Sequence, residues 1–346
     1  MSWKLGVVGA GSWGTALAVH FADAGHDVLL WARDRDLSRR LAKTRDNHKY
    51  LPGVVFPKSL HIVRDLVEVH ESAVVLVVVP SHGFRSTIKE LLAAAPDPRV
   101  RAGLGAAPVT IVSATKGVET ETWARMSQVC AEEASAAGRE IRFAVLSGPT
   151  FAAELARGAP TAAVVASEAP GLAKRLREEL ATPSFRLYSS SDVVGVELAG
   201  AAKNVIAVAA GVVAGLELGH NTVAALITRG LHEMTRLGVA CGGEERTFSG
   251  LAGLGDLVLT CTGGLSRNRR AGMALAAGKS LAEIEAETAM VAEGIRNSRS
   301  LTGLARRQGI EMPIADQMMR VLYQDKDPRE ALEELMNRER KSEHEL

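Results

Sequence analysis

The chain has 346 residues, which is enough for two domains of ordinary size. Hydrophobic residues make up 47% of it and charged residues 23%, the balance of a globular protein with a large core. The formal net charge of +1 argues against nucleic acid or an anionic membrane as the main partner. The cysteines are odd in number and lack metal-ligand spacing, and the N-terminus has no signal-peptide pattern. We therefore expect a cytoplasmic protein with reduced thiols at Cys130, Cys241 and Cys261.

Strand-like and helix-like stretches alternate through the first half of the chain. The strand-like runs are rich in β-branched residues and end in small or turn residues, at residues 3–11, 26–34, 73–81, 109–117, 141–150, 161–168 and 185–190. Helical patterns lie between most of them, for example at residues 14–25, 84–95 and 171–180. This alternation predicts an α/β, Rossmann-type domain over residues 1–191, with a mostly parallel sheet covered by helices on both faces.

The first strand-like run ends in a glycine-rich turn, "GAGSWG". Gly9, Gly11 and Gly14 have the G-x-G-x-x-G spacing of dinucleotide-binding turns, between a strand and a helix. In such turns the first glycine permits the tight turn, the second lets the backbone approach a pyrophosphate, and the third lets the helix pack closely. The helix N-terminus would offer free N–H groups to the phosphates. The alternative is a glycine-rich turn without a ligand.

The second strand-like run ends in "ARDRD", where enzymes that prefer NAD usually place an acidic residue for the ribose hydroxyl. This chain has Arg33 there, and a guanidinium suits the 2′-phosphate of NADP. We therefore expect NADP(H) to be preferred. Asp34 leaves NAD(H) open, and a merely solvated arginine is a third interpretation.

Polar residues follow three later strands, at the edge of the sheet where ligands bind in this fold class. His82 follows one strand and is more simply a solvated loop residue than an acid or base. Lys116 follows another and is a candidate to face the nicotinamide. Gly148 and Thr150 lie at a third strand-to-helix turn, where Thr150 would cap the helix.

From residue 192 to the end the pattern is helical, which predicts an all-α second domain over residues 192–346. Its first helix, residues 197–216, is almost entirely small and apolar but contains Lys203 and Asn204. A central lysine disfavours a membrane span, so we expect a buried core helix. A buried ammonium is costly unless it is paired or loses its proton readily, which favours Lys203 as a catalytic acid or base. A lysine that reaches solvent from the helix flank is the alternative.

Further polar groups interrupt the apolar second half. Asp256 stands alone between glycine and leucine, as a functional residue or a turn cap. A hydroxyl, a guanidinium and an amide come together in a glycine-flanked turn, which is either a phosphate site or an exposed basic turn: Ser266, Arg267 and Asn268.

With these motifs together, the chain resembles the bacterial-type NAD(P)-dependent glycerol-3-phosphate dehydrogenases from about residue 4 to residue 330. The resemblance includes "GAGSWGTALA", "NHKYLPG", "SATKG", "SGPTFAAEL", "AAKNVIAVAAG", "GLAGLGDLVLTCT", "SRNRR" and "VAEG". It departs where many relatives have "GGALKN" for "AGAAKN", and Ser for Thr150. The first departure keeps the Lys203–Asn204 pair, and the second keeps a side-chain hydroxyl.

The resemblance implies a role for each candidate residue. The cofactor residues would be Gly9, Gly11, Ser12, Trp13, Gly14, Arg33, Tyr50, Lys116, Ala152, Arg267, Val291 and Glu293. The substrate residues would be Lys116, Gly148, Thr150, Lys203, Asp256, Ser266, Arg267 and Asn268, with Lys203 as proton donor and acceptor.

The implied reaction interconverts dihydroxyacetone phosphate and sn-glycerol 3-phosphate, for phospholipid synthesis, without a metal. A homodimer is compatible with these features, and neither nucleic acid nor a membrane span is expected. Two rival functions remain, a related hydroxy-acid dehydrogenase and a nucleotide-binding regulator without turnover. A substrate with a carboxylate in place of the phosphate would indicate the first, and nucleotide binding without turnover the second.

Overall fold

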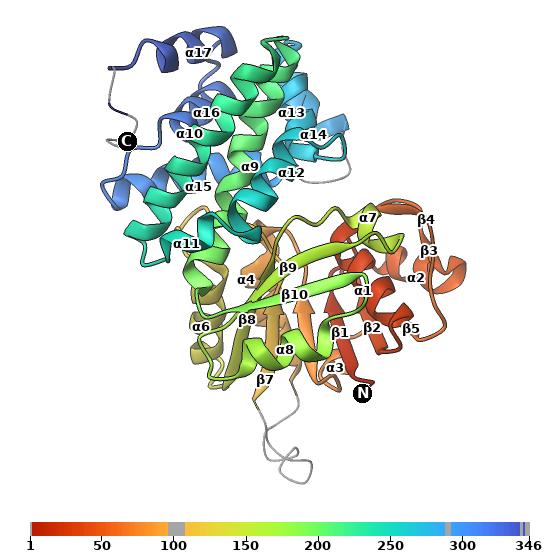
Figure 1. Cartoon of the computed structure of the whole chain (residues 1–346). Helices are drawn as coiled ribbons and strands as arrows, with labels where there is room; N and C mark the ends of the chain where they lie inside the picture. The colour runs from red at the N-terminus through yellow and green to blue at the C-terminus, as the bar shows by residue number, and fades with distance from the viewer. Residues whose placement is uncertain (1, 96–107, 288–291, 340–341, 343–346) are drawn as a thin grey trace. The chain divides into compact units, whose positions relative to one another are not determined.

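The computed structural model describes residues 2–95, 108–287, 292–339 and 342. The chain divides into two compact units (Figure 1). The sheet unit comprises Met1–Thr115 and Ala124–Val193, and the helical unit comprises Lys116–Trp123 and Val194–Leu346. The second crossing between the units lies close to the boundary expected at residues 191 and 192. Residues 116–123, which the alternating sequence pattern placed in the first domain, group with the helical unit instead.

The sheet unit contains an eight-stranded sheet in the order β10-β9-β8-β7-β6-β1-β2-β5. All neighbouring strands are parallel except β8 and β9, which are antiparallel. The prediction of a mostly parallel α/β sheet is therefore confirmed. The strands are β1 (Lys4–Val8), β2 (Asp27–Trp31), β5 (Leu60–Val63), β6 (Val74–Val77), β7 (Val109–Ser113), β8 (Ile141–Ser147), β9 (Thr161–Ala166) and β10 (Phe185–Ser190).

Three strands were not predicted from the sequence. The edge strand β5 pairs with β2, and β3 (Asp46–Asn47) pairs with β4 (Leu51–Val55) in a separate two-stranded sheet. The pair is short, and β4 contains Pro52 and Gly53, residues that are disfavoured in strands. Local pattern therefore gives little signal for either strand.

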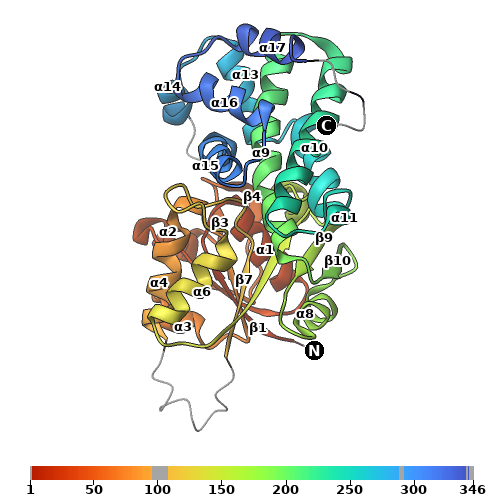
Figure 2. The same ribbon diagram turned by 90° about the vertical axis from the view of Figure 1, so that its left-hand side faces the viewer.

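Two apolar cores lie on opposite faces of the sheet because alternate residues of each strand face opposite ways. Leu5 and Val7 of β1 belong to one core and Val8 belongs to the other. Figure 2 shows three helices together on one side of the sheet, α3 (Leu66–Val69), α4 (Phe84–Ala94) and α6 (Met126–Ala136). The other core takes side chains from α1 (Ser12–Asp23), α2 (Arg35–Thr44), α7 (Ala152–Ala156) and α8 (Leu172–Leu180).

The central strand β1 has β2 on one side and β6 on the other. The chain order reverses at this strand, which makes its carboxyl end the topological switch point of the sheet. Open α/β sheets bind their ligands at this point. The turn after β1 carries the three glycines identified in the sequence.

The described residues of the second half contain helices and no strand, as predicted. The helices are α9 (Val193–Gly215), α10 (Gly219–Ala240), α11 (Glu245–Phe248), α12 (Asp256–Thr262), α13 (Arg267–Ala276), α14 (Leu281–Glu287), α15 (Glu293–Arg307), α16 (Pro313–Tyr323) and α17 (Pro328–Met336). One turn of π-helix, η2 (Leu251–Gly255), comes directly before α12.

Helix α9 is long and apolar enough to cross a membrane by length and composition, but 89% of its apolar window is buried inside the structure. The prediction of a buried core helix is confirmed by this burial. Small residues let neighbouring helices approach its backbone closely. A Cβ on Gly211 would lie 2.0 Å from the carbonyl oxygen of Arg269, and one on Gly294 would lie 2.2 Å from that of Asn204. Helices α13 and α15 therefore pack directly against the part of α9 that carries Lys203.

Candidate active site

The glycine-rich turn of the sheet unit requires its glycines for different reasons. Gly9 has φ +118°, and a Cβ there would lie 2.3 Å from the carbonyl oxygen of Val78. A Cβ on Gly14 would lie 1.9 Å from the carbonyl oxygen of Gly9, so α1 packs too closely for a side chain. At Gly11 a Cβ would meet nothing within 4 Å. This glycine leaves its backbone accessible, which is the property that a pyrophosphate-binding turn needs.

Asn47, which was not predicted to have a role, holds this turn in place. Its side chain is 1% exposed, and its Nδ2 donates to the carbonyl oxygen of Ala10 (3.0 Å) and to Thr15 Oγ1 (2.8 Å). Its Oδ1 accepts from the backbone N–H of Tyr50 (3.2 Å), and Ser12 Oγ donates to the Tyr50 carbonyl (2.6 Å). The "NHKYLPG" motif thus fixes both the turn and Tyr50. The only sequence signal for Asn47 is its place in that motif.

Trp13 is the second helical residue after the turn. Its indole Nε1 is buried and has no hydrogen-bond partner among the described residues. A buried donor of this kind normally has a partner. An unpaired donor beside an accessible glycine turn and a helix N-terminus fits a bound dinucleotide, which would offer several acceptor oxygens.

Arg33 and Asp34 follow β2 and have different roles. Arg33 is exposed, and its guanidinium donates to Thr87 Oγ1 (2.8 Å) and Ser86 Oγ (3.2 Å) on α4. Asp34 instead caps α2, because its Oδ1 accepts from the backbone N–H groups of Asp36 (2.9 Å) and Leu37 (3.0 Å). These contacts hold the pKa of the Asp34 carboxyl below its usual value. Asp34, whose presence kept NAD(H) binding possible in the sequence, is therefore engaged as a helix cap.

The strand-to-helix turn after β8 is fixed by Gly148, which has φ +152°. A Cβ there would lie 2.8 Å from Ala163 Cα on the adjacent strand. Thr150 Oγ1 donates to the Gly148 carbonyl (3.1 Å) and does not cap α7, whose N-cap is Phe151. The expectation of a Thr150 cap was wrong, because the helix begins one residue later than the cap required. Ala152 is the first residue of that helix.

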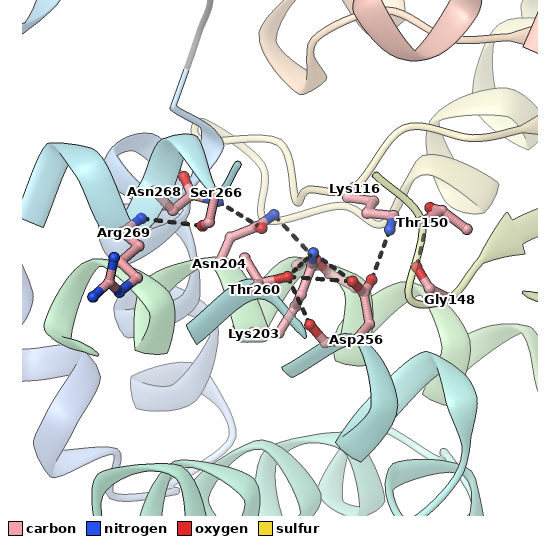
Figure 3. A network of polar contacts seen from close by, with 12 residues as sticks. Lys116, Gly148, Thr150, Lys203, Asn204, Asp256, Thr260, Ser266, Asn268 and Arg269 are labelled. Carbon is pink, nitrogen blue, oxygen red and sulfur yellow. Dashed lines mark hydrogen bonds and ion pairs between the residues drawn. The ribbon is translucent and has the colours of Figure 1, made fainter. Parts of the chain in front are cut away.

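In the helical unit, two lysines converge on one carboxylate (Figure 3). Lys203 Nζ lies 2.8 Å from Asp256 Oδ1, and Lys116 Nζ lies 2.6 Å from Asp256 Oδ2. The side chains of Lys203, Asp256 and Lys116 are 7%, 1% and 17% exposed, so Lys116 is the most accessible of the three. Two ammonium groups share one carboxylate, which leaves an excess of one positive charge when both are protonated. Such an excess would stabilise an oxyanion that forms beside it.

Thr260, one turn after Asp256 on α12, completes this cluster and was missed in the sequence. Lys203 Nζ donates to Thr260 Oγ1 (2.7 Å), and that hydroxyl donates to the backbone carbonyl of Asp256 (2.6 Å). The turn of π-helix η2 leads directly into Asp256, a feature that often occurs at functional sites. The i, i+4 spacing of Asp256 and Thr260 is the only local signal, and it is common to many helices.

Burial and charge together set the protonation of the cluster. Burial, partly opposed by Asp256 and reinforced by the like charge of Lys116, lowers the pKa of Lys203 to about 8. Burial alone would raise the pKa of Asp256, but Lys116 and Lys203 hold it below its usual value. Lys203 can therefore gain and lose a proton near neutral pH while Asp256 stays ionised, as acid–base catalysis requires.

The turn of Ser266, Arg267 and Asn268 begins α13, and its side chains are used differently. Ser266 caps the helix, with Oγ accepting from the backbone N–H of Arg269 (3.2 Å). Asn268 is buried, and its Nδ2 donates to Asn204 Oδ1 (2.8 Å) while its Oδ1 accepts from the backbone N–H of Gly294 (2.9 Å). Of the three residues, Arg267 alone is exposed. Within this turn, Arg267 is therefore the residue most accessible to a phosphate.

The remaining candidates lie at the start of α15. Burial lowers the pKa of the Arg267 guanidinium, and the carboxylate of Glu293, the first residue of α15, partly opposes this shift. Val291 lies outside the described residues. No group of three or more His, Cys, Asp or Glu side chains in the described ranges has an arrangement that could hold a metal ion.

A glycine turn at the switch point of a doubly wound sheet, and a lysine with a pKa near neutral, together indicate the class of nicotinamide-dependent dehydrogenases. Comparison with known proteins identifies the family within this class. The model of the NAD-dependent glycerol-3-phosphate dehydrogenase N-terminus matches residues 4–173, and that of the C-terminus matches residues 192–333.

Individual relatives agree along the whole chain. The glycerol-3-phosphate dehydrogenase [NAD(P)+] of Geobacter sulfurreducens is 49% identical over 346 residues, covering 99% of both chains. That of Koribacter versatilis is 48% identical and covers 97% of both. The crystal structure of glycerol-3-phosphate dehydrogenase from Coxiella burnetii is 40% identical, with a TM-score of 0.90, and covers 97% of this chain and 99% of that one. The chain belongs to the NAD-dependent glycerol-3-phosphate dehydrogenase family and is an NAD(P)-dependent oxidoreductase.

Proposed function

We propose that the chain reduces dihydroxyacetone phosphate to sn-glycerol 3-phosphate, with Lys203 as the proton donor and NADPH as the preferred cofactor. The observation that carries the acid–base assignment is the buried cluster in which Lys203 and Lys116 share Asp256. Family membership supports the choice of substrate. The product would supply phospholipid synthesis in the cytoplasm, and a homodimer is compatible with the chain.

The residues of the sheet unit would hold the nucleotide. Gly9, Gly11 and Gly14 would position the pyrophosphate at the N-terminus of α1, where backbone N–H groups and the helix dipole favour negative charge. Trp13 Nε1 would donate to the nucleotide, and Tyr50 and Ala152 would contact it. When bound, the nicotinamide supplies the hydride for C2 of the substrate. Lys116, Arg267, Val291 and Glu293 would complete its contacts.

The cluster in the helical unit would carry out the proton transfer. As the new C–H bond forms at C2, the electron pair of the carbonyl bond moves to its oxygen. The excess positive charge of Lys203 and Lys116 stabilises that oxygen, and Lys203 Nζ gives it a proton. In the reverse direction neutral Lys203 removes the proton. Asp256 orients both lysines, and its negative charge offsets the repulsion between the two ammonium groups.

The substrate phosphate would be bound by the turn at the start of α13. Arg267 is the exposed residue of this turn and offers its guanidinium, and Ser266 and Asn268 fix the turn through the contacts described above. Gly148 and Thr150 would also contact the substrate. Anchoring the phosphate holds the carbonyl in position for reduction, which lowers the entropic part of the barrier.

NADPH preference rests on Arg33. Its guanidinium is held by Thr87 and Ser86 and is exposed, whereas Asp34 is engaged at the start of α2. A held guanidinium can bind a 2′-phosphate in bidentate fashion. Replacing Arg33 with alanine should lower kcat/KM for NADPH by about tenfold to a hundredfold, since charge-assisted bonds contribute roughly 1.5–3 kcal/mol. The value for NADH should change little.

The deciding experiment follows the nicotinamide absorbance with dihydroxyacetone phosphate and each cofactor. Oxidation of NADPH faster than NADH is the expected result. A hydroxy acid without phosphate is the control substrate. Turnover of the hydroxy acid alone would assign the chain a different substrate, and nucleotide binding without any turnover would contradict the proposal.

A further inference from the structure

Residues 116–123 have an unusual place in the molecule. In the sequence they follow β7 of the sheet unit and precede α6 of the same unit, yet they group with the helical unit. This segment, which we call the Lys116 segment, begins with the lysine that contacts Asp256. Its attachment to the helical unit therefore determines where that ammonium lies.

One face of α15 supplies the attachment. Residues three or four positions apart share a helix face, and Asn297, Ser300 and Gly303 follow this spacing. Asn297 Nδ2 donates to the backbone carbonyl of Lys116 (3.3 Å), and Ser300 Oγ donates to Thr120 Oγ1 (3.3 Å). The contacts therefore follow the same order along the helix as along the Lys116 segment, from its start toward its end.

The far end of the segment is held at Trp123. Its indole ring lies over Gly303, where a Cβ would come within 2.4 Å of Trp123 Nε1. The guanidinium of Arg307 lies 5.4 Å from the ring centroid and donates to the carbonyl of Thr122 (3.5 Å). Trp123 also has φ +58°, a left-handed conformation that a bulky residue adopts only when its surroundings impose it. The close approach of the Trp123 ring thus explains why residue 303 is a glycine. The packing of the ring against α15 in turn explains how Trp123 keeps its strained backbone conformation.

Asn297 contacts the backbone at or near both lysines. Its side chain is fully buried, and its Nδ2 also donates to the carbonyl of Ala201 (3.2 Å), two residues before Lys203 on α9. One amide group therefore connects the backbone of Lys116 to the helix that carries Lys203. Both ammonium groups then meet at Asp256. A shift of this amide would change the distance between the two charges.

We propose that this face of α15 is a positioning platform for Lys116, with Asn297 as its key positioning residue and Gly303 and Trp123 as its distal clamp. Asn297 acts through Lys116 and does not itself take part in the chemistry. The platform assembles Lys116, Asp256 and Lys203 within one unit. The proposal rests on the function proposed above, in which both lysines act on the substrate oxygen.

The test is a double-mutant cycle on kcat for the reduction of dihydroxyacetone phosphate. Asn297→Leu keeps the number and branching of the side-chain heavy atoms and removes the donor, and we expect kcat to fall about tenfold while KM for NADPH stays within twofold. In a Lys116→Ala background the same change should alter kcat less than twofold, because the Lys116 ammonium is already absent and only the contact with the Ala201 carbonyl remains to be lost near Lys203. Equal effects of Asn297→Leu in both backgrounds, or wild-type kcat in Lys116→Ala, would overturn the proposal.

The pH profile gives a readout that simple loss of packing would not move. Lys203 is faced by Asp256 and Cys261 from α12 and by Lys116 from the segment. Displacing Lys116 removes a like charge, so the pKa seen in kcat for reduction should rise in Asn297→Leu. An unchanged pKa together with a lowered kcat would overturn the positioning role.

A second variant tests the platform far from the lysines and does not depend on the folding of Asn297→Leu. Gly303→Ala should displace the Trp123 ring and lower kcat about threefold to tenfold, although alanine favours a helix. Adding Trp123→Phe removes the nearest ring atom, Nε1, and should restore most of kcat. Arg306→Ala is the matched control, since Arg306 lies on the same helix and pairs with Asp316 (3.1 Å) instead of the segment.

Wild-type turnover of dihydroxyacetone phosphate is measured first, because it tests the proposed function alone. With that turnover established, wild-type kcat in Gly303→Ala would overturn the distal clamp. A loss of kcat in Arg306→Ala as large as that in Gly303→Ala would do the same.

Discussion

Two buried carboxylates of the helical unit have opposite electrostatic environments. Asp256 is 1% exposed and is held by two ammonium groups, and its pKa lies below its usual value. Glu233 on α10 is 5% exposed and accepts from two backbone N–H groups at the start of α16, those of Ile314 (2.7 Å) and Ala315 (3.4 Å). Burial, only partly offset by these bonds, raises its pKa to about 7.

The difference shows that burial alone does not set the pKa of a carboxylate. Two backbone N–H groups bind Glu233 as a cap at the start of α16, but they do not fully offset the cost of burying its charge. Two lysines keep Asp256 ionised, and Asp256 in turn keeps the lysines close together while burial makes Lys203 a weaker base. The first arrangement ties two helices together, whereas the second creates a group that exchanges protons near neutral pH.

The largest expected effect comes from removing Lys203, the proposed acid. Lys203→Ala should lower kcat about a thousandfold, because both the proton donor and part of the oxyanion stabilisation are lost. The affinity for NADPH, measured by fluorescence titration, should stay within a few fold. If the variant retained a tenth of wild-type kcat, another group would be the acid.

Asp256→Asn should have the next largest effect. It leaves two buried ammonium groups without a carboxylate, so kcat should fall about a hundredfold and the free energy of unfolding by about 3 kcal/mol. Steady-state kinetics and urea unfolding measure the two losses. Wild-type kcat in this variant would show that the shared carboxylate is dispensable.

Glu233→Gln is the matched carboxylate-to-amide change, and its effect should appear in stability rather than in kcat. The folded state binds the Glu233 proton up to a pH of about 7, whereas the unfolded chain releases it near its ordinary pKa of 4.5. Wild-type stability from this group is therefore present below pH 4.5 and is lost as the pH rises through 7. The shift corresponds to roughly 3 kcal/mol.

Glutamine does not titrate, so the fall in Tm between pH 5 and 8 should be smaller in Glu233→Gln than in the wild type. The exposed Glu333→Gln on α17 is the control and should follow the wild-type curve. A tenfold loss of kcat in Glu233→Gln would show that Glu233 also supports turnover, and would contradict the difference in role proposed for the two carboxylates.

The sequence was sufficient for the parts of the molecule that depend on local pattern. The alternation of strands and helices, the glycine turn after β1 and the buried lysine of α9 could all be recognised from a few neighbouring residues. The structure shows why Gly9 and Gly14 must be glycines, since one has a positive φ and the other packs against the turn.

Contacts between distant residues could not be predicted in this way. Asn47, Thr260 and Asn297 are ordinary polar residues in the sequence. Each has a distant partner that no local pattern reveals: those of Asn47 and Asn297 lie between 32 and 181 positions away, and that of Thr260, Lys203, lies 57 positions away. The sequence also placed Lys116 in the first domain, because the segment that carries it lies between two elements of the sheet unit. Only the folded chain shows its attachment to α15.

The most direct test of the central claim is the pH dependence of hydride transfer in single turnovers, measured in both directions with the wild-type enzyme. If Lys203 is the acid and base, reduction should slow as the pH rises through about 8, and oxidation should accelerate through the same pKa. Lys116→Ala should move that pKa upward because a repelling charge is removed. Rates that do not change between pH 6 and 10 in either direction would contradict the account.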